Sequence, residues 1–295
     1  MTDSPLPVGR FAPSPSGALH FGSLLAALAS FLDIRQRGGR WLVRMEDLDP
    51  DREPPGAADE ILRLLDAFRL HWDGEVMYQS QRLEIYADAL RDLEKQGRTY
   101  PCSCPRRRVR ELRGRYDGYC ARHPATVRKP AAIRVRVPTG ALTFDDRIQG
   151  QQAFDLSTTC GDFIVRRKDG LFAYQLATAV DDGDQQITEV LRGSDLLDST
   201  PRQIHLQRAL GLAVPSHAHI PVASNVEGQK LSKQHFARPL DARYATQYLY
   251  DALSFLGQQP PDRLKGAAAG ELLEWGIGHW DIQKVPRVAT IVTDQ

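Results

Sequence analysis

The chain has 295 residues, of which 42% are hydrophobic and 25% are charged, and its formal net charge is +1. These values are typical of a soluble globular protein long enough for one large domain with an insertion, or for two domains. No apolar run approaches the roughly 20 residues of a membrane span, and residues 1–7 do not form a signal peptide, so we expect a cytoplasmic protein with no membrane partner.

The first predicted unit is a strand, a loop and a helix within residues 9–23. The loop Pro13–Gly17 holds two prolines, two serines and a glycine, so it predicts irregular backbone before a helix that begins near His20. A helix N-terminus presents unpaired backbone N–H groups, which suit a phosphate. His20 would donate to phosphate oxygens, and Gly22 would let a flat base lie against the backbone. For His20 on its own, an ordinary helix start is the alternative.

A second strand is predicted at Arg40–Met45, after a glycine stop at Gly38-Gly39. It completes a β-loop-α-β unit of the doubly wound type. Three carboxylates follow within Glu46–Asp49, at the ligand-binding edge of such a fold. Because a buried carboxylate needs a cationic partner, Glu46 is expected to bind a substrate ammonium. The alternative is a surface turn paired with Arg52.

Two helices with apolar residues at helical spacing are predicted next, as crossover helices around a parallel sheet. The first begins at Pro54-Pro55, and its apolar positions are Ile61, Leu62, Leu64, Leu65 and Phe68. The second spans Arg82–Gln96, is stopped by Gly97, and has the apolar positions Leu83, Tyr86, Leu90 and Leu93.

Three of the four cysteines fall within nineteen residues, at Cys102, Cys104 and Cys120. Because a reducing compartment disfavours disulfides, this spacing indicates a structural zinc site, and three unmetallated thiols are the alternative. Coordination chemistry alone favours His123 as the fourth ligand. The isolated Cys160 is expected to be a small packed residue.

The same region is strongly basic, with eleven Lys or Arg against two acids between residues 106 and 136. Such a block is either a solvated face or a surface that binds RNA phosphates. Short alternating runs at Ile133–Val137 and Phe163–Arg166 predict a small β-rich insertion.

Further along, Ser199-Thr200-Pro201 caps a helix that runs to Leu210, and a strand follows near residues 219–222. A polar loop then carries Lys230-Leu231-Ser232-Lys233. Helices are predicted within Leu240–Leu256 and Gly270–Trp280.

Two of these segments resemble the signature motifs of the class I aminoacyl-tRNA synthetases: His20–Ser23 resembles the first and Lys230–Gln234 the second. Residues Arg10–Pro15 resemble the glutamyl and glutaminyl branch. Leu19–Leu24, together with the short chain, resembles the subfamily that glutamylates queuosine in tRNA(Asp).

The resemblance implies an α/β fold: a Rossmann-like doubly wound parallel sheet with an inserted zinc-bearing α+β subdomain and a short helical C-terminal tail, lacking an anticodon-binding domain. The expected parts are a first half of the nucleotide-binding core at 1–98, a zinc-containing, acceptor-binding-like insertion at 99–170, a second half of the core at 171–240, and a helical region at 241–295.

The resemblance also implies site residues. His20 and Lys233 are the expected catalytic donors. The expected ATP-binding residues are Pro13, His20, Gly22, Lys230, Ser232 and Lys233. The expected glutamate-binding residues are Arg10, Phe11, Ala12, Pro13, Ser14, Glu46, Tyr174 and Arg192. The subfamily points to Tyr116, rather than His123, as the fourth zinc ligand beside Cys102, Cys104 and Cys120.

A substrate with two carboxylates and one ammonium requires two cations and one anion, and Arg10, Arg192 and Glu46 match that count. The expected function is therefore activation of L-glutamate by ATP with Mg²⁺, and transfer of glutamate to the queuosine base of tRNA(Asp), by a monomer. Three alternatives stay open: a conventional glutamyl-tRNA synthetase that charges a tRNA 3′ end, a small nucleotidyltransferase, and a non-catalytic tRNA-binding paralogue.

Overall fold

The predicted β-loop-α-β unit is confirmed in the computed structural model, which describes residues 6–225 and 238–293. Strands β1 (Val8–Phe11) and β2 (Arg40–Met45) pair in parallel, and helix α1 (Phe21–Arg35) connects them. His20 is the N-cap of α1, and its Nδ1 accepts a hydrogen bond from the Ser23 N–H at 3.2 Å. The helix therefore begins where the Pro-Ser loop predicts.

These strands belong to a seven-stranded sheet in the order β3-β2-β1-β9-β10-β6-β7. The strands not yet introduced are β3 (Met77–Tyr78), β6 (Leu142–Asp146), β7 (Gly150–Phe154), β9 (Glu189–Gly193) and β10 (Ser216–Ile220). The strand order reverses between β1 and β9, and the crevice outside the carboxyl ends of the strands at such a reversal is the usual ligand site of these sheets.

The sheet is mixed, rather than wholly parallel as predicted. Every neighbouring pair from β3 to β6 is parallel, but β7 runs antiparallel to β6 at the edge. This hairpin lies within the stretch predicted as the insertion, yet it pairs with β10 through His217 and Asp146. The sequence pattern gave no sign of that long-range pairing.

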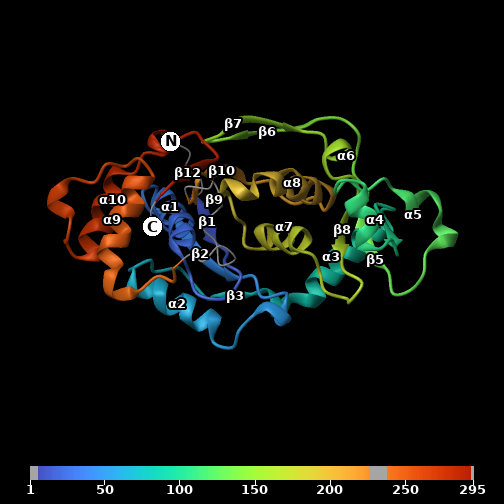
Figure 1. Cartoon of the computed structure of the whole chain (residues 1–295), viewed down its shortest axis with the longest axis horizontal. Helices are drawn as coiled ribbons and strands as arrows, with labels where there is room; N and C mark the ends of the chain where they lie inside the picture. The colour runs from blue at the N-terminus through green and yellow to red at the C-terminus, as the bar shows by residue number, and fades with distance from the viewer. Residues whose placement is uncertain (1–5, 226–237, 294–295) are drawn as a thin grey trace.

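Helices cover both faces of the sheet (Figure 1). One side carries α1 with α9 (Ala245–Phe255) and α10 (Ala269–His279), and the other carries α7 (Tyr174–Asp184) and α8 (Thr200–Ala209). The helices predicted near residues 200–210, 240–256 and 270–280 are therefore confirmed.

Helices α2 (Ala57–Ala67) and α3 (Leu83–Lys95) are also present, with two corrections. Helix α2 begins at Ala57, after Gly56 in a left-handed conformation, and not at Pro54-Pro55. Leu83 is exposed and not part of the core, because it begins its helix on the solvent side.

A separate antiparallel sheet of β4 (Thr99–Cys102), β5 (Ala132–Val135) and β8 (Phe163–Arg166) lies at the end of the molecule opposite α9 and α10 (Figure 1). The strands predicted in this region are confirmed. The short helices α4 (Arg106–Glu111), α5 (Tyr119–Arg122) and α6 (Leu156–Thr159) accompany this sheet.

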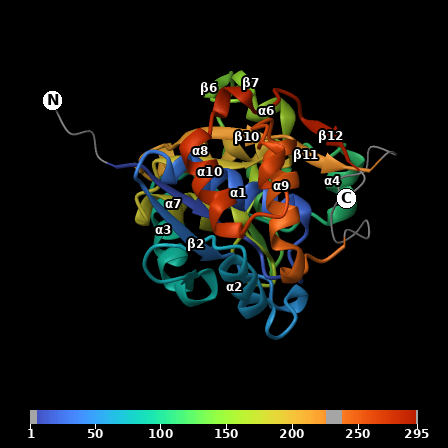
Figure 2. The ribbon, with the colours of Figure 1, turned by 90° about the vertical axis from the view of Figure 1, so that its left-hand side faces the viewer.

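Near the C-terminus, β12 (Thr290–Val292) pairs in parallel with β11 (Val222–Ser224), and Figure 2 shows the two side by side. Among the described residues, no helix has the length and apolar character needed to cross a membrane.

Asp33, a buried residue of α1, joins three parts of this fold. Its carboxylate accepts two hydrogen bonds from Arg147 at 2.8 and 2.9 Å, one from Arg37 at 2.6 Å and one from Trp280 Nε1 at 3.2 Å. It thereby connects α1 to the β6–β7 hairpin and to the segment after α10.

We expect Asp33→Ala to lower the free energy of unfolding by about 2 to 4 kcal/mol, because Arg147 loses its main carboxylate partner while remaining partly buried. Urea unfolding followed by circular dichroism measures the change. Asp92→Ala is the matched control: its ion pair with Lys95 is exposed, so the loss should stay below about 1 kcal/mol. Equal effects of the two variants would contradict the role assigned to Asp33.

Candidate active site

A cavity of about 530 Å³ lies at the carboxyl ends of β1 and β9. Its lining includes every predicted ATP- and glutamate-binding residue within the described part of the chain: Arg10, Phe11, Ala12, Pro13, Ser14, His20, Gly22, Glu46, Tyr174 and Arg192. The three remaining predicted residues, Lys230, Ser232 and Lys233, lie outside the described residues. The cavity also has lining residues that were not predicted, among them Asp195, Val222 and Ala223.

One end of the cavity is formed by the start of α1. Because Nδ1 of His20 accepts the Ser23 N–H, the proton of a neutral ring must be on Nε2, which makes Nε2 the donor. Pro239 pairs with His20, and the Leu240 N–H donates to the Leu19 carbonyl at 2.9 Å. The residues that follow the segment 226–237 thus lie at this end of the cavity.

The other end is dominated by the Arg192 guanidinium, which is 4% exposed. It donates to Thr200 Oγ1 at 2.8 Å and to Tyr174 Oη at 3.4 Å, both uncharged acceptors. It forms no ion pair with any carboxylate in the described part of the chain. Burial lowers the pKa of Arg192, as expected for a cation removed from water. A ligand carboxylate would compensate this buried charge.

Arg192 is held from behind by a buried histidine. Its Nε donates to His219 Nε2 at 3.1 Å, and His219 Nδ1 lies 2.5 Å from an Asp146 carboxylate oxygen. Since Nε2 accepts, the ring proton is on Nδ1 and is donated to Asp146. Burial lowers the pKa of His219, so the ring orients the guanidinium without adding a second positive charge.

This arrangement of His219 and Asp146 was not predicted. His217 and His219 alternate along one strand, which is a weak signal in the sequence. Nothing in the sequence connects Asp146 with His219, because the pairing depends on the unexpected position of β6 beside β10.

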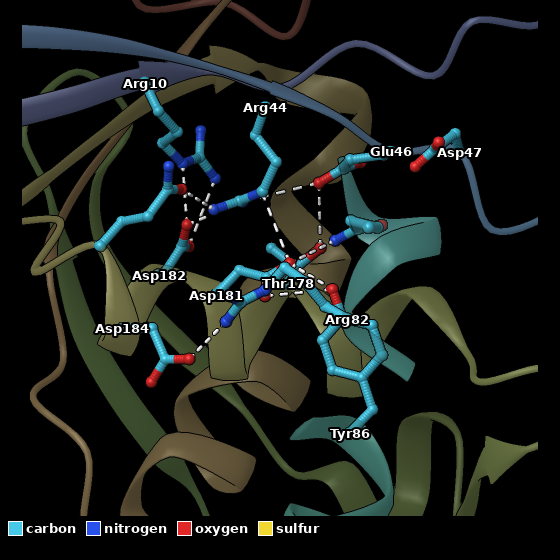
Figure 3. A network of polar contacts seen from close by, with 12 residues as sticks. Arg10, Arg44, Glu46, Asp47, Arg82, Tyr86, Thr178, Asp181, Asp182 and Asp184 are labelled. Carbon is cyan, nitrogen blue, oxygen red and sulfur yellow. Dashed lines mark hydrogen bonds and ion pairs between the residues drawn. The ribbon is translucent and has the colours of Figure 1, made fainter. Parts of the chain in front are cut away.

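A network of buried charges lies beneath the cavity (Figure 3). Asp182 accepts from Arg10 Nε at 3.1 Å and from Arg44 Nη2 at 2.8 Å. Burial alone would raise the pKa of Asp182, but the two guanidinium groups hold it below its usual range. Arg10 therefore lines the cavity while sharing its charge with Asp182, whereas Arg192 does not share its charge.

Glu46 extends this network into the cavity (Figure 3). It lies 3.6 Å from Arg44 Nη2 and accepts from Thr178 Oγ1 at 3.1 Å. Burial raises the pKa of Glu46, and a nearby cation lowers it, so a ligand ammonium would favour the ionised form. The alternative of a surface turn is wrong: Glu46 is buried, and Arg52 pairs with Asp49 instead.

Asp181, the neighbour of Asp182 on α7, has further partners outside the two strands. It accepts from Arg82 at 2.8 Å and from Tyr86 Oη at 2.8 Å (Figure 3). It also accepts from Gln79 at 2.7 Å. These contacts fix the position of α7 below the cavity. Asp182 binds side chains from the strands, and Asp181 binds side chains from α3 and the turn before it.

The three clustered cysteines come together in the insertion. The sulfurs of Cys102, Cys104 and Cys120 lie within 4.8 Å of one another. The Tyr116 hydroxyl lies 3.4 Å from Cys102 Sγ and 3.5 Å from Cys104 Sγ. Tetrahedral zinc, with bonds of about 2.3 Å to sulfur and about 2.1 Å to oxygen, separates such ligand atoms by roughly 3.5 to 3.8 Å. This donor set therefore fits a four-coordinate metal.

His123 does not join that cluster. Its side chain is exposed, and its Nδ1 lies 3.0 Å from the carbonyl oxygen of Tyr119. Although burial raises the pKa of Cys120, hydrogen bonds from Tyr116 and Cys104 bring it down to about 7. A thiolate, which is the form that binds metal, is thus accessible near neutral pH. Cys160 is partly buried and packs against an apolar cluster that includes Phe163, Val165 and Leu206, as expected of a packed thiol.

Comparison with known proteins agrees with this geometry. Residues 8–256 match the family of class I tRNA synthetases (E and Q), catalytic domain. The glutamyl-Q tRNA(Asp) synthetase of Ectopseudomonas mendocina is 52% identical over 290 residues, covering 98% of both chains. The protein of that name from Thiobacillus denitrificans is 53% identical over 285 residues and 95% of both chains.

Solved structures show the same fold. The glutamate–tRNA synthetase of Elizabethkingia anophelis superposes with a TM-score of 0.81 at 23% identity, over 98% of this chain and 68% of that one. A glutamate tRNA ligase of Elizabethkingia meningosepticum, in complex with its amino acid, gives 0.79 at 24% identity, over 96% of this chain and 66% of that one. The family accounts for both the motif resemblance and the sheet order. The chain belongs to the class I aminoacyl-tRNA synthetases, in the glutamyl and glutaminyl branch that includes the glutamyl-Q tRNA(Asp) synthetases.

Proposed function

We propose that this enzyme activates L-glutamate with ATP and transfers the glutamyl group to the queuosine base of tRNA(Asp), the activity that the names of its relatives describe. The observation that carries the proposal is Arg192, a buried cation that lines the cavity and has no ion-paired carboxylate within the described residues. An amino acid with a second carboxylate supplies the missing anion, and Glu46 is placed to receive its ammonium.

In the first step, an oxygen of the glutamate α-carboxylate attacks the α-phosphorus of ATP, and pyrophosphate leaves. The protein positions the two reactants and stabilises the developing charge, and forms no covalent bond itself. Arg10 and Arg192 orient the carboxylates, and Glu46 and Tyr174 orient the amino group. Mg²⁺ bound with the nucleotide would supply the charge that neutralises the pyrophosphate.

ATP would lie at the α1 end of the cavity, with a phosphate against the helix N-terminus and Nε2 of His20 as a donor. Lys230, Ser232 and Lys233 complete this site in the proposal. Its support comes from the described flanks of their segment: Val222 and Ala223 line the cavity, and Pro239 pairs with His20.

The inserted part, residues 99–170, would bind the RNA. Of its eleven basic residues between 106 and 136, most are exposed, as a phosphate-binding surface requires. We assign the zinc to Cys102, Cys104, Cys120 and Tyr116, where it would have a structural role. Cytoplasmic conditions would keep these thiols reduced.

The first test is transfer of labelled glutamate to tRNA(Asp) with and without queuosine. We expect a labelled product only with the queuosine-containing tRNA, and this product should be labile to alkali, as an ester is. Of the amino acids, only glutamate should support pyrophosphate exchange. Labelling of the 3′ end would favour a conventional synthetase, and exchange driven by another acid would favour a nucleotidyltransferase.

Arg192→Lys tests whether the buried guanidinium of Arg192 binds a carboxylate of glutamate. Lysine keeps the charge but cannot grip a carboxylate with two parallel hydrogen bonds, so we expect the KM for glutamate to rise about ten- to a hundredfold. The KM for ATP should change less than threefold or so, because Arg192 lies at the other end of the cavity. Parallel increases in both constants would contradict the assignment.

Lys233→Ala should slow adenylate formation by roughly a hundred- to a thousandfold, about 3 to 4 kcal/mol, the usual loss for one donor to a transition-state charge. Pre-steady-state formation of glutamyl-adenylate measures this step directly. A near-normal rate of pyrophosphate exchange would remove Lys233 from the catalytic residues.

The purified protein should contain one zinc per chain by mass spectrometry. Cys104→Ser should lose the metal, and Tyr116→Phe should bind it more weakly, whereas Cys160→Ser and His123→Ala should retain it. Loss of zinc in His123→Ala, with retention in Tyr116→Phe, would reverse the choice of the fourth ligand.

A further inference from the structure

A second cavity, of about 380 Å³, adjoins the one assigned to glutamate and ATP. Four residues line both: Ser14, Ser16, Glu46 and Tyr174. A ligand in the second cavity would therefore meet the proposed glutamate beside Glu46 and Tyr174. In the proposal, a nucleophile reaches the activated carboxyl group across this shared boundary.

The second cavity has a polar lining of its own. The cationic residues that line it are Arg52 and Arg167. Both form ion pairs with Asp49, at 2.7 and 3.0 Å. Glu53 also lines the cavity and forms no ion pair within the described residues. Its Oε1 accepts the Asp49 N–H at 3.0 Å, and the second carboxylate oxygen has no hydrogen-bond donor among the described residues.

Glu53 is half-buried, and burial raises its pKa. The charges of Asp47 and Asp49 raise this pKa further, whereas the hydrogen bond from the Asp49 N–H and the charge of Arg52 lower it. A positively charged ligand group beside Glu53 would offset the cost of burial and the repulsion, and would favour the ionised carboxylate.

Arg167 also lines a third cavity, of about 980 Å³, on the insertion. The basic residues that line this third cavity besides Arg167 are Arg106, Arg110, Arg113, Arg134, Lys168 and Arg202, against the single acid Asp169. The three cavities thus follow one another from a basic surface, past Arg167 and Glu53, to the glutamate. An RNA whose phosphates lie on the basic cavity can present one unstacked base to the second cavity.

We propose that the second cavity receives the base that becomes glutamylated, and that the Glu53 carboxylate binds a cationic amine on that base. The inference rests on the proposed function. A queuosine base fits because a secondary amine, protonated at neutral pH, links its 7-deazaguanine ring to the cyclopentene-diol. One diol oxygen attacks the glutamyl carbonyl carbon, an ester bond forms, the bond to the phosphate oxygen breaks, AMP leaves, and the hydroxyl proton goes to solvent.

Glu53→Gln tests the charge without removing the local hydrogen bond, because the glutamine oxygen still accepts the Asp49 N–H. We expect kcat/KM for transfer to queuosine-containing tRNA(Asp) to fall about ten- to a hundredfold, the usual effect of losing one charged hydrogen bond. Glutamate-dependent pyrophosphate exchange in the same variant is the reference, since Glu53 does not line the glutamate cavity. Glu75→Gln, at an exposed position, is the matched control for both assays.

Inhibition by tRNA(Asp) that lacks queuosine separates recognition of the base from docking of the RNA. Its inhibition constant should be the same for Glu53→Gln and the wild type, because that RNA has no amine for Glu53 to bind. Transfer within twofold of wild type in Glu53→Gln would overturn the inference, and so would an equal weakening of both RNAs. A wild-type enzyme without glutamate-dependent exchange would instead refute the proposed function.

Discussion

The buried carboxylate of Asp182 is the interaction on which the site depends, because it binds arginines from two adjacent strands. Arg10 on β1 and Arg44 on β2 converge on it from above α7. Arg10 thus shares its charge with Asp182, whereas Arg192 forms no ion pair with a carboxylate among the described residues. A second carboxylate on the ligand would compensate the buried charge of Arg192, which gives specificity a physical cause.

Much of this arrangement could be predicted from local sequence. The Pro-Ser loop locates the start of α1, and residues at the ends of parallel strands must meet at one edge, so Arg10, Glu46 and Arg192 could be predicted to share a site. The partners of these residues could not. Asp182 is 172 positions from Arg10, and His219 depends on a hairpin that joins the sheet edge through a single pair of residues. Tertiary pairing of this kind leaves no periodic pattern in the sequence. A helical pattern also does not show which apolar residue at the start of a helix faces solvent, so Leu83 was predicted in the core although it is exposed.

The cysteine-bearing segment at residues 102–120 poses a different physical problem, because it is rich in arginine and has few apolar residues. The buried cluster around the cysteines consists of Tyr100, Cys102, Tyr116 and Cys120, so three of its four buried members are residues that would hold a metal. Arg134 lies over the Tyr116 ring at 3.7 Å and covers the cluster with a charged group. In such a segment the free energy of metal binding becomes free energy of folding. A basic surface can then be displayed on a small scaffold without the large apolar core that an arginine-rich sequence cannot supply.

The sharing of residues between cavities bears on how the two chemical steps are coupled. Glu46 and Tyr174 line both the glutamate cavity and the adjoining one, so a base that enters the second cavity contacts the groups that hold the amino acid. Arg192 and Glu53 each line only one of the two cavities. In this proposal, activation requires the charge of Arg192 and transfer requires the charge of Glu53. The two cavities meet at Glu46 and Tyr174. A base bound in the second cavity would close the glutamate cavity on that side, and would exclude water from the adenylate when hydrolysis competes with transfer.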